Sequence, residues 1–534
     1  MSLAKIFTAT KSKSRYEAYQ INKPEVFTLL LVLTIGSIVR FYDIGGRSIW
    51  TDEGFSEWAS RQSLWYLWSV LPTFETNPPL YYTLLKGWRF IFGDGEAALR
   101  SLSAFFGVAT IPFIFLMGRM LGNRDTGWVS GGIAAAIFAL SPIHIYYAQE
   151  ARAYTMLAFG VTIAMTGAMW LMLNQRQVCA AISRQPFSSK KQILGMLGLL
   201  ALGMGLTMWS HDTGAFAVIA LALPIIYWWL IEAKCSRGAL LKLLITCSIS
   251  FALFLPYLMP LLSHMGQVST SFWVEKPSIW GIQKTVVALV TGTYGANITF
   301  FIFCALSVFS VITLWLRGKR SIAMLLVSIA LFPILAEILV SFLAMPIFLK
   351  RTLLYVNIPL YIAIGYAISQ VRIMYLRVIM AAIVIAFQST LFQPQRQITN
   401  DDTWKAVSEY LSQALQSGQP VMLLPLEVSP TLKYYAVKQG AEFQIEGLPT
   451  NWPEPSESFP TMDAVPGGKK MKPTDMLRVS RLVKSSQRLA LISRRDDLFD
   501  PTSMTIREIM KTHEVAETKK FMRGVVTVMI FTAR

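Results

Sequence analysis

The sequence predicts an all-α polytopic membrane protein with about 11–13 membrane-spanning helices, followed by a small C-terminal soluble α/β domain. Of the 534 residues, 54% are hydrophobic and only 15% are charged. Soluble proteins carry about 25% charged residues, and repeated membrane spans are the common cause of such a deficit. In addition, long apolar runs alternate with short basic clusters between residues 25 and 392, which is typical of membrane spans and their loops.

The net charge of +18 does not indicate a nucleic-acid partner. The Lys and Arg residues lie in short clusters between apolar runs, as in the cytoplasmic loops of membrane proteins. A nucleic-acid groove would gather them in one soluble domain. The sequence also contains no GxxxxGK[ST] motif and no dinucleotide fingerprint after a predicted strand, so an ATPase or a dehydrogenase is unsupported. We therefore expect the lipid bilayer, and no nucleic acid, as a partner.

The chain starts with a polar, basic segment, residues 1–24, which we expect to be cytoplasmic. The apolar run 25–44 is long enough to cross about 30 Å of hydrocarbon. No small-residue cleavage site follows this run, so we expect it to stay as the first span. The loop 43–77 then lies outside, and its excess of acidic residues agrees with that side.

An acidic pair, Asp52 and Glu53, stands among aromatic residues in this external loop, within SIWTDEGFSEWA at 48–59. The stretch 55–71 is rich in Trp and predicts one or two helices lying on the membrane surface. In an extended loop, adjacent side chains point in opposite directions. We therefore expect the two carboxylates to have different roles.

The next spans are predicted from apolar runs. The segment 78–93 opens with two prolines that suit a helix start, but it is short for a span. Spans at 99–121 and 128–142 precede a polar, Tyr-rich interruption at 143–157 and a further apolar run. If every one of these segments crossed the membrane, the basic clusters would not all lie on the cytoplasmic side. Either 78–93 does not fully cross, or one basic cluster lies outside. Further spans are expected near 194–209, 213–232, 240–262, 298–316, 321–344, 352–371 and 373–392, with an external loop at 264–297.

The character of the chain changes at about residue 393, where a polar linker begins and charges of both signs become balanced. Residues 393–534 predict a small soluble α/β domain, which the order of the spans places outside. Its expected elements are an amphipathic helix at 403–418, a strand at 419–426, a short helix around LKYYAVKQ, a loop at 450–475 and strands at 488–495 and 524–534.

Five motifs come in a familiar order. They are Arg47 with WTDEGFS (50–56), NPPLYYTLLKGW (77–88), FGDGEAALRSLSAFFG (92–107), SPIHIYYAQEARAYTM (141–156) and PIFLKRTLL (346–354). The chain resembles the polyprenyl-phosphate-sugar-dependent glycosyltransferases of the GT-C fold, specifically the glycosyltransferase family 39 group, which includes protein O-mannosyltransferases and lipid A aminoarabinose transferases. The resemblance is strong over residues 30–360. It implies a transmembrane glycosyltransferase domain at 25–392, with its catalytic loop at 43–77.

The resemblance implies transfer of one sugar from a polyprenyl-phosphate carrier to an acceptor hydroxyl. The leaving group is already a stable phosphate anion, so the second carboxyl group that glycosidases need is not required. One carboxylate suffices as general base on the acceptor hydroxyl, and the attack inverts the anomeric centre. The resemblance assigns this role to Asp52. Glu53 is expected to orient Asp52 or to bind the acceptor; the alternative is that both are solvated loop charges.

The departing phosphate needs cations, and Arg is its best bidentate partner. The resemblance points to Arg351, with Lys350 beside it and Arg152, as the groups that bind the donor phosphate. Arg351 stands at the head of a span on the predicted external side, although Thr352 occupies a position where the family usually has an aromatic residue. The alternative for Arg351 is an interfacial side chain that reaches lipid headgroups.

Polar residues near the spans complete the predicted site. Glu150 and Arg152 are two positions apart and do not face each other on a helix, so they are not expected to form a local ion pair. A charge near a span usually faces a cavity and has a partner, but a buried structural pair is an equal alternative. An interfacial belt would explain the tyrosines as well as a pocket does. We predict a sugar and acceptor pocket lined by Arg47, Tyr81, Tyr82, Glu150 and Tyr154.

A metal site is the least specific of the predictions. Family members often have a His where His211 stands, and together with Glu75 it would hold a divalent cation. However, Thr76 and Asn77 stand where relatives often carry an acidic residue or His, and a lone His is more often structural. No cofactor is therefore required, and a divalent cation at Glu75 and His211 stays an open alternative.

Two other function classes are left open. A polytopic secondary transporter of a lipid-linked or polar substrate would explain the spans, but it predicts inverted repeats and a site near the bilayer midplane. No repeat is detectable in the sequence, and the polar motifs cluster at one surface. A non-enzymatic partner of a glycan polymerase, or a sensor, is the third class. We favour a multi-pass inner-membrane glycosyltransferase with its active site and C-terminal domain outside, a polyprenyl-phosphate-linked sugar donor, and a lipid, protein or glycan acceptor.

Overall fold

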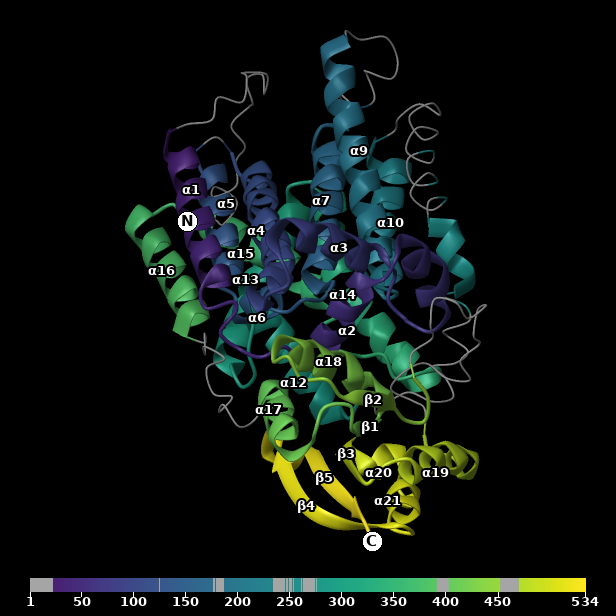
Figure 1. The fold of residues 1–534 in the computed structure, drawn as a ribbon. Coiled ribbons are helices and arrows are strands. Elements are labelled where there is room, and N and C mark those ends of the chain that lie inside the picture. Colours follow the sequence, from purple (N-terminus) through teal and green to yellow (C-terminus); the bar gives the residue numbers. More distant parts are fainter. Residues whose placement is uncertain are drawn as a thin grey trace.

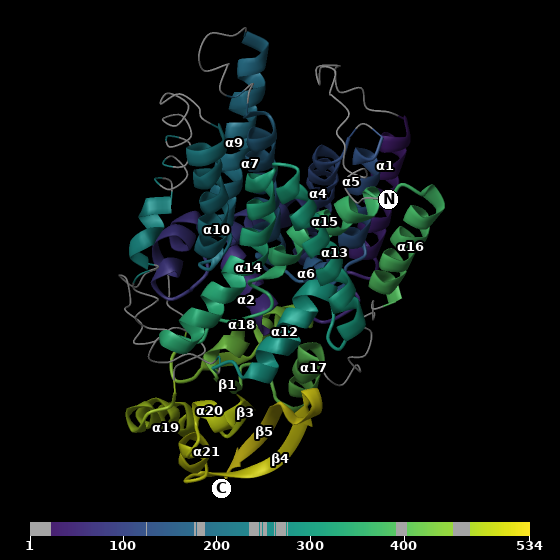
Figure 2. The ribbon, with the colours of Figure 1, turned by 180° about the vertical axis from the view of Figure 1, so that it is seen from behind.

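The computed structural model describes residues 23–390, 403–451 and 470–534, except for gaps at 124, 176–177, 179–186 and most of 234–275. Figures 1 and 2 show a bundle of helices with the C-terminal domain attached at one end. The C-terminus lies in that domain, at the end of the molecule farthest from the bundle.

The helices of the bundle differ widely in length. Their inward faces form a continuous apolar core, and their outward faces are apolar as well, with Ile298 at 73% and Leu316 at 77% exposure. Apolar side chains exposed over so many helices indicate a surface that faces lipid. The helices are α1 (Lys23–Phe41), α4 (Glu96–Leu121), α5 (Gly127–Ala139), α6 (Pro142–Ala148), α7 (Tyr154–Leu173), α9 (Phe187–Ser210), α10 (Gly214–Tyr227), α12 (Ile279–Thr291), α13 (Asn297–Leu316), α14 (Arg320–Leu343), α15 (Ile358–Ser369) and α16 (Met374–Thr390).

Seven helices in the described parts of the chain are long and apolar enough to cross a membrane, or eight if the bent pair α5–α6 is one span. Shorter apolar helices, among them α12, accompany them. The predicted fold class is confirmed, while the number of 11–13 spans stays a prediction. The predicted span 240–262 and the first part of the predicted loop 264–297 lie mostly outside the described residues, and the rest of that loop contains α12.

The segment 78–93 forms a helix that is too short to be a span. Helix α3 (Leu80–Phe92) has 13 residues, which at 1.5 Å per residue gives about 20 Å against about 30 Å of hydrocarbon. It begins after Pro79 and ends at Gly93, whose φ of 88° is a conformation that favours glycine. The first of the two alternatives for this region, that 78–93 does not fully cross, therefore agrees with the structure.

Helices α5 and α6 meet at a 58° bend, where Pro142 begins α6. The break leaves the last carbonyls of α5 without helical partners. Arg40 of α1 is fully buried there and donates to the carbonyl oxygens of Ala139 at 2.8 Å and Phe138 at 3.2 Å. The bend carries the chain into the turn 149–153, in the region where the sequence predicted a polar interruption.

The C-terminal domain is a five-stranded sheet with helices, in the strand order β2-β1-β3-β5-β4. Strand β1 runs parallel to β2 and β3, whereas β5 runs antiparallel to β3 and β4. The strands are β1 (Pro420–Leu424), β2 (Gln444–Gly447), β3 (Arg488–Arg494), β4 (His513–Phe521) and β5 (Val526–Ala533). The helices are α17 (Trp404–Ala414), α18 (Ser429–Lys438), α19 (Met476–Lys484), α20 (Asp496–Phe499) and α21 (Met504–Ile509).

The structure contains the two predicted helices and the three predicted strands of this domain, with β1, β3 and β5 at the expected positions. Strands β2 and β4 were not predicted. Strand β4 reads HEVAETKKF, and every residue between its two ends is exposed. It lies at the edge of the sheet, where a charged strand needs no alternating apolar face.

The C-terminal domain shares an apolar core with the beginning of the chain. Ile49 and Phe55 belong to the same buried cluster as residues of α18. Helix α18 packs against α2 (Thr51–Arg61), as Figure 1 shows. At Gly54 the two helices come so close that a Cβ atom would overlap the side chain of Thr431. The domain is therefore seated on the segment that carries the acidic pair.

Candidate functional site

Asp52 and Glu53 lie in the first turn of α2, and not in the extended loop that the sequence predicted. Glu53 Oε2 accepts a hydrogen bond from the backbone N–H of Trp50 at 3.2 Å, which caps the start of the helix. Carboxylates in a first turn are also favoured by the positive end of the helix dipole. Neighbours on a helix point about 100° apart, so the two carboxylates still face different surroundings.

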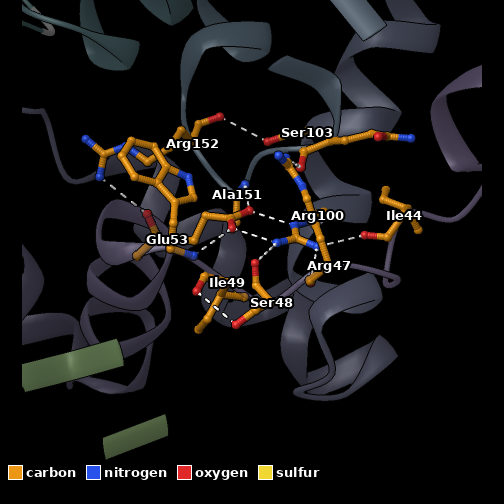
Figure 3. A network of polar contacts seen from close by, with 12 residues as sticks. Ile44, Arg47, Ser48, Ile49, Glu53, Arg100, Ser103, Ala151 and Arg152 are labelled. Atoms are coloured by element: carbon orange, nitrogen blue, oxygen red, sulfur yellow. Dashed lines mark hydrogen bonds and ion pairs between the residues drawn. The ribbon is translucent and has the colours of Figure 1, made fainter. Parts of the chain in front are cut away.

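Glu53 is completely buried and forms a bidentate ion pair with Arg100 of α4, shown in Figure 3. Arg100 Nε donates to Oε1 and Nη2 donates to Oε2, both at 2.7 Å. The backbone N–H of Ala151 donates to Oε1 at 3.0 Å. This network ties α2, α4 and the turn before α7 together. Arg100 also donates to the carbonyl oxygens of Ile44, Arg47 and Ser48.

The hydrogen bonds of Glu53 account for both of its oxygens. Each oxygen accepts two N–H donors, which fills the sites of an ionised carboxylate. Burial alone would raise the pKa of Glu53, but the charge and hydrogen bonds of Arg100 bring it below its ordinary value. Glu53 is thus ionised and fully engaged at neutral pH.

Asp52 lies on the accessible side of the same helical turn. Its Oδ2 pairs with Nη1 of Arg351 at 3.2 Å, and the two side chains are 27% and 20% exposed. Arg152 Nη1 lies 3.4 Å from the Asp52 carbonyl oxygen and 3.3 Å from the hydroxyl of Tyr82. The structure therefore brings together Asp52, Arg152 and Arg351 from three distant parts of the sequence.

Three cations, Arg152, Lys350 and Arg351, gather near Asp52. Arg152 is buried, and neither it nor Lys350 has a carboxylate within ion-pair distance in the parts of the chain that the structure describes. The Lys350 ammonium lies 4.5–6.0 Å from the centroids of three aromatic rings. Of the three cations, Arg351 pairs directly with Asp52, and the charges of Asp52 and Glu75 also act on Arg152. A cluster of three cations around one accessible carboxylate suits an anion such as phosphate. The three rings are those of Tyr146, Tyr147 and Tyr294.

Tyr154 holds two of these cations near each other. Its ring centroid lies 5.7 Å from Cζ of Arg351 and 5.9 Å from Cζ of Arg152. A guanidinium over an aromatic ring is stabilised by the negative face of the ring. Tyr154 is itself buried at the start of α7, so its position is fixed by packing.

The segment that carries Lys350 and Arg351 is held by buried polar side chains of α14. Ser341 Oγ accepts hydrogen bonds from two backbone N–H groups of that segment, at 3.0 and 2.9 Å. Glu337 Oε2 accepts a hydrogen bond from Thr352 Oγ1 at 3.0 Å. Thr352, where the resembling family usually has an aromatic residue, thus has a specific polar partner in this chain.

Glu150 is buried but incompletely partnered. It is 2% exposed, and its Oε2 has no hydrogen-bond partner among the residues described here. Burial, together with the charge of Glu53, raises the pKa of Glu150 to about 7. Arg47 lies nearby, donates to the carbonyl oxygen of Gln149 at 2.6 Å, and partly offsets this rise. Buried polar atoms normally have a hydrogen-bond partner, so this oxygen is able to accept a further hydrogen bond.

The predicted pocket tyrosines of α3 point to different places. The Tyr82 hydroxyl donates to Glu75 Oε1 at 3.2 Å and lies beside Arg152, which places it in the site. The hydroxyl of Tyr81 is hydrogen-bonded to Ser103 Oγ at 2.8 Å. Tyr81 therefore packs behind the site, against α4, and supports it without lining it.

Glu75 and His211 do not gather a set of metal ligands. His211 Nδ1 accepts a hydrogen bond from the backbone N–H of Thr213 at 3.2 Å. Burial, followed by the charges of Arg152 and Arg351, lowers the pKa of His211 to about 3, so the ring is neutral. Within the described ranges, no group of three or more His, Cys, Asp or Glu residues is arranged to hold a metal ion.

Three residues that shape the site were not predicted from the sequence: Arg100, Glu337 and Tyr435. The first two are ionisable residues inside the predicted spans 99–121 and 321–344. A charge within a span normally faces the bundle interior and has a partner, and this signal was available in the sequence. Tyr435 belongs to the soluble domain, where a tyrosine carries no comparable signal.

No protein-family model and no curated protein matches the chain. Solved structures do resemble it. ArnT from Cupriavidus metallidurans in the apo state aligns over 95% of this chain and 98% of that chain, with a TM-score of 0.62 and 14% identity. The same protein bound to undecaprenyl phosphate aligns over 94% and 97%, with a TM-score of 0.59 and 14% identity. The Archaeoglobus fulgidus oligosaccharyltransferase aligns over 91% of this chain and 71% of that chain, with a TM-score of 0.50 and 13% identity. These proteins have the GT-C fold, and this likeness shows that the chain has it too.

Proposed function

We propose that this GT-C-fold membrane protein is a glycosyltransferase that moves one sugar from a polyprenyl-phosphate carrier to an acceptor hydroxyl, with inversion. Asp52 is the general base, and Arg351, Lys350 and Arg152 bind the phosphate of the donor. One observation carries the proposal: the accessible carboxylate of Asp52 lies 3.2 Å from Arg351, and the Arg152 guanidinium lies beside the Asp52 carbonyl oxygen.

The donor class follows from the charge and the lipid-facing surface. A phosphate group placed beside Arg351 would also attract Lys350 and Arg152, so three cations could bind it. The apolar outer faces of the helices suit the long lipid attached to that phosphate. The ArnT structure that resembles this chain is bound to undecaprenyl phosphate, and we infer a carrier of the same class here.

The ion pair between Asp52 and Arg351 suggests how the base is activated. Arg351 forms an ion pair with Asp52, and a bound phosphate would compete for the same guanidinium. Asp52 then accepts the proton of the acceptor hydroxyl, and the acceptor oxygen attacks the anomeric carbon. The bond between that carbon and the phosphate oxygen breaks, and its electron pair leaves with the phosphate. The cations stabilise the charge that develops on the leaving group.

The remaining residues have distinct roles in this proposal. Glu150 and Tyr82 present polar atoms next to the cations, and we assign them, with Arg47 and Tyr154, to the sugar and acceptor pocket. Glu53 is a positioning residue, because Arg100 and backbone N–H groups occupy both of its oxygens. The proposed step needs no metal ion, and the described residues contain no group of three or more His, Cys, Asp or Glu residues arranged to hold one.

The site and the C-terminal domain lie at the same end of the bundle (Figure 2). We place this end on the external, periplasmic side of the inner membrane, because residues 1–24 are basic and suit the cytoplasm. The acceptor is a lipid, a protein or a glycan that presents a hydroxyl group on that side.

The test is sugar transfer by the full-length protein in nanodiscs, supplied with a panel of radiolabelled polyprenyl-phosphate sugars and membrane extract. We expect Asp52→Asn to transfer sugar at least about 100-fold more slowly than the wild type, the usual contribution of a general base, with an unchanged melting temperature. Asp94→Asn is the matched control, because Asp94 is also an exposed carboxylate paired with an arginine, Arg89 at 2.6 Å. Equal transfer by Asp52→Asn and the wild type would refute the assignment of the base.

A secondary transporter is the alternative that the same experiment addresses. In the described residues, the polar groups of the site gather at one end of the helices, and a transporter would need them near the bilayer midplane. If Asp52→Asn transfers as well as the wild type, movement of labelled donor across proteoliposome membranes is the next measurement.

A further inference from the structure

Tyr435 of α18 contacts the backbone that leads into the catalytic helix α2. Its hydroxyl oxygen accepts hydrogen bonds from the backbone N–H of Ile49 at 2.7 Å and from Ser48 Oγ at 2.8 Å. Tyr435 is 2% exposed and Ile49 is 1% exposed, so both groups are shielded from water. Without the tyrosine hydroxyl, a buried N–H group would be left without a partner, which is costly.

The same segment is held from the membrane side as well. Arg100 Nη2 donates to the carbonyl oxygen of Ser48 at 3.0 Å. Ser48 is therefore fixed by α4 on one side, and by Tyr435 of the C-terminal domain on the other. Figure 3 shows Ser48 and Ile49 next to the Arg100 guanidinium.

A second set of contacts holds the first residue of α2. Thr431 Oγ1 donates to the carbonyl oxygen of Thr51 at 3.4 Å, and Arg494 Nη1 donates to Thr51 Oγ1 at 3.1 Å. Thr51 directly precedes Asp52. The carbonyl and the side chain of Thr51 are thus both bonded to the C-terminal domain, while the carboxylate of Asp52 stays 27% exposed.

We propose that the C-terminal domain completes the active site, with the hydroxyl of Tyr435 acting as a positioning group for the turn that presents Asp52. This inference rests on the proposed function of Asp52. The segment that leads into α2 is held between Arg100 and Tyr435, so the domain sets the angle at which Asp52 meets the acceptor hydroxyl. A small misplacement of a base lowers the rate of proton transfer without weakening the binding of the donor.

The chain offers a matched control in the adjacent residue. Tyr434 is also a buried tyrosine of α18, and its hydroxyl donates to the carbonyl oxygen of Asp94 at 3.1 Å, in the turn between α3 and α4. Tyr434→Phe and Tyr435→Phe thus each remove one hydroxyl from the same helix and the same docking surface. Only the second removes a bond to the segment that leads into Asp52.

The experiment compares kcat and the KM for the donor in full-length wild type, Tyr434→Phe and Tyr435→Phe. We expect Tyr435→Phe to lower kcat about tenfold with little change in KM, and Tyr434→Phe to keep both values within about twofold. A purely structural role would lower kcat in both variants in proportion to their loss of melting temperature. Equal kcat values for the two variants would overturn the proposal.

Backbone hydrogen exchange gives a readout that does not depend on activity. In Tyr435→Phe, the amides of residues 49–54 should exchange faster than in the wild type, and in Tyr434→Phe they should not. Unchanged protection of residues 49–54 in Tyr435→Phe would overturn the proposal even if activity fell. If the wild type shows no transfer with any donor, the proposed function fails, while the exchange experiment still decides whether Tyr435 positions this turn.

Discussion

Glu53 and Glu150 are both buried carboxyl groups next to Asp52, yet their oxygens are satisfied very differently. Glu53 accepts four N–H donors. Glu150 has an oxygen without a partner among the described residues. Burial raises the pKa of both, but Arg100 brings that of Glu53 below its ordinary value, whereas the charge of Glu53 adds to the rise at Glu150.

This difference distinguishes a residue that holds the site in place, Glu53, from a residue of the proposed pocket, Glu150. A carboxylate whose hydrogen bonds are all made within the protein cannot accept further bonds from a ligand, and its function is to hold the backbone. A buried carboxyl group with a free oxygen costs stability, and a bound ligand can recover that cost. The same contrast holds for the cations, because Arg100 is fully engaged while Lys350 has only ring contacts in the described structure.

Glu53→Gln should have the largest effect on stability. It leaves the buried Arg100 charge without its counter-charge and turns an amide N–H₂ toward N–H donors, which costs about 3–5 kcal/mol. Thermal unfolding in detergent micelles measures the loss. The control is Glu409→Gln, which removes an exposed pair with Lys405 and should cost less than about 0.5 kcal/mol. Similar losses in the two variants would mean that the buried pair does not support the fold.

Glu150→Gln should stabilise the protein, but only at higher pH. The folded protein keeps the Glu150 proton up to about pH 7, whereas the unfolded chain releases it near its ordinary pKa of 4.5. Unfolding therefore releases a proton between these values, and the wild type loses stability as the pH rises through this interval, by roughly 3 kcal/mol in total. Glutamine cannot ionise, so the variant escapes this loss.

Melting temperatures measured from pH 5 to pH 8 test this prediction. The stabilities of the wild type and Glu150→Gln should be closest near pH 5, and the advantage of the variant should grow from there to pH 8. Glu53→Gln should be less stable than the wild type across the whole range. If Glu150→Gln were less stable than the wild type at pH 8, the ionised carboxylate of Glu150 would stabilise the fold. The proposed difference between Glu53 and Glu150 would then be wrong.

Lys350→Gln should have the smallest effect on stability and a selective effect on donor binding. Removing one cation from the phosphate site should raise the KM for the donor about tenfold, with kcat within about twofold and an unchanged melting temperature. Lys438→Gln is the control, because the Lys438 ammonium also lies 4.5 Å from a tyrosine ring, that of Tyr434. The same rise in KM in both variants would show that Lys350 does not bind the donor specifically.

Sequence reasoning identified the fold class and placed Asp52, Arg351 and Arg152 in one candidate site. The fold class is confirmed, because long apolar runs are local signals, and the structure brings Asp52, Arg351 and Arg152 together, while their roles stay predictions. It did not distinguish Glu53 from Glu150, because the difference depends on Arg100 and on the backbone N–H of Ala151, which are distant in sequence. The role of Tyr435 and the exposed strand β4 were missed for the same reason: both depend on how the C-terminal domain pairs and docks.

The most direct test of the account is the anomeric configuration of the transferred sugar, measured by NMR on the product formed from a donor of known configuration. A single displacement, with Asp52 as base and phosphate as leaving group, predicts that the configuration is inverted. Retention would mean that the acceptor oxygen does not attack opposite the departing phosphate in one displacement, and it would contradict the proposed role of Asp52 as the base for that attack.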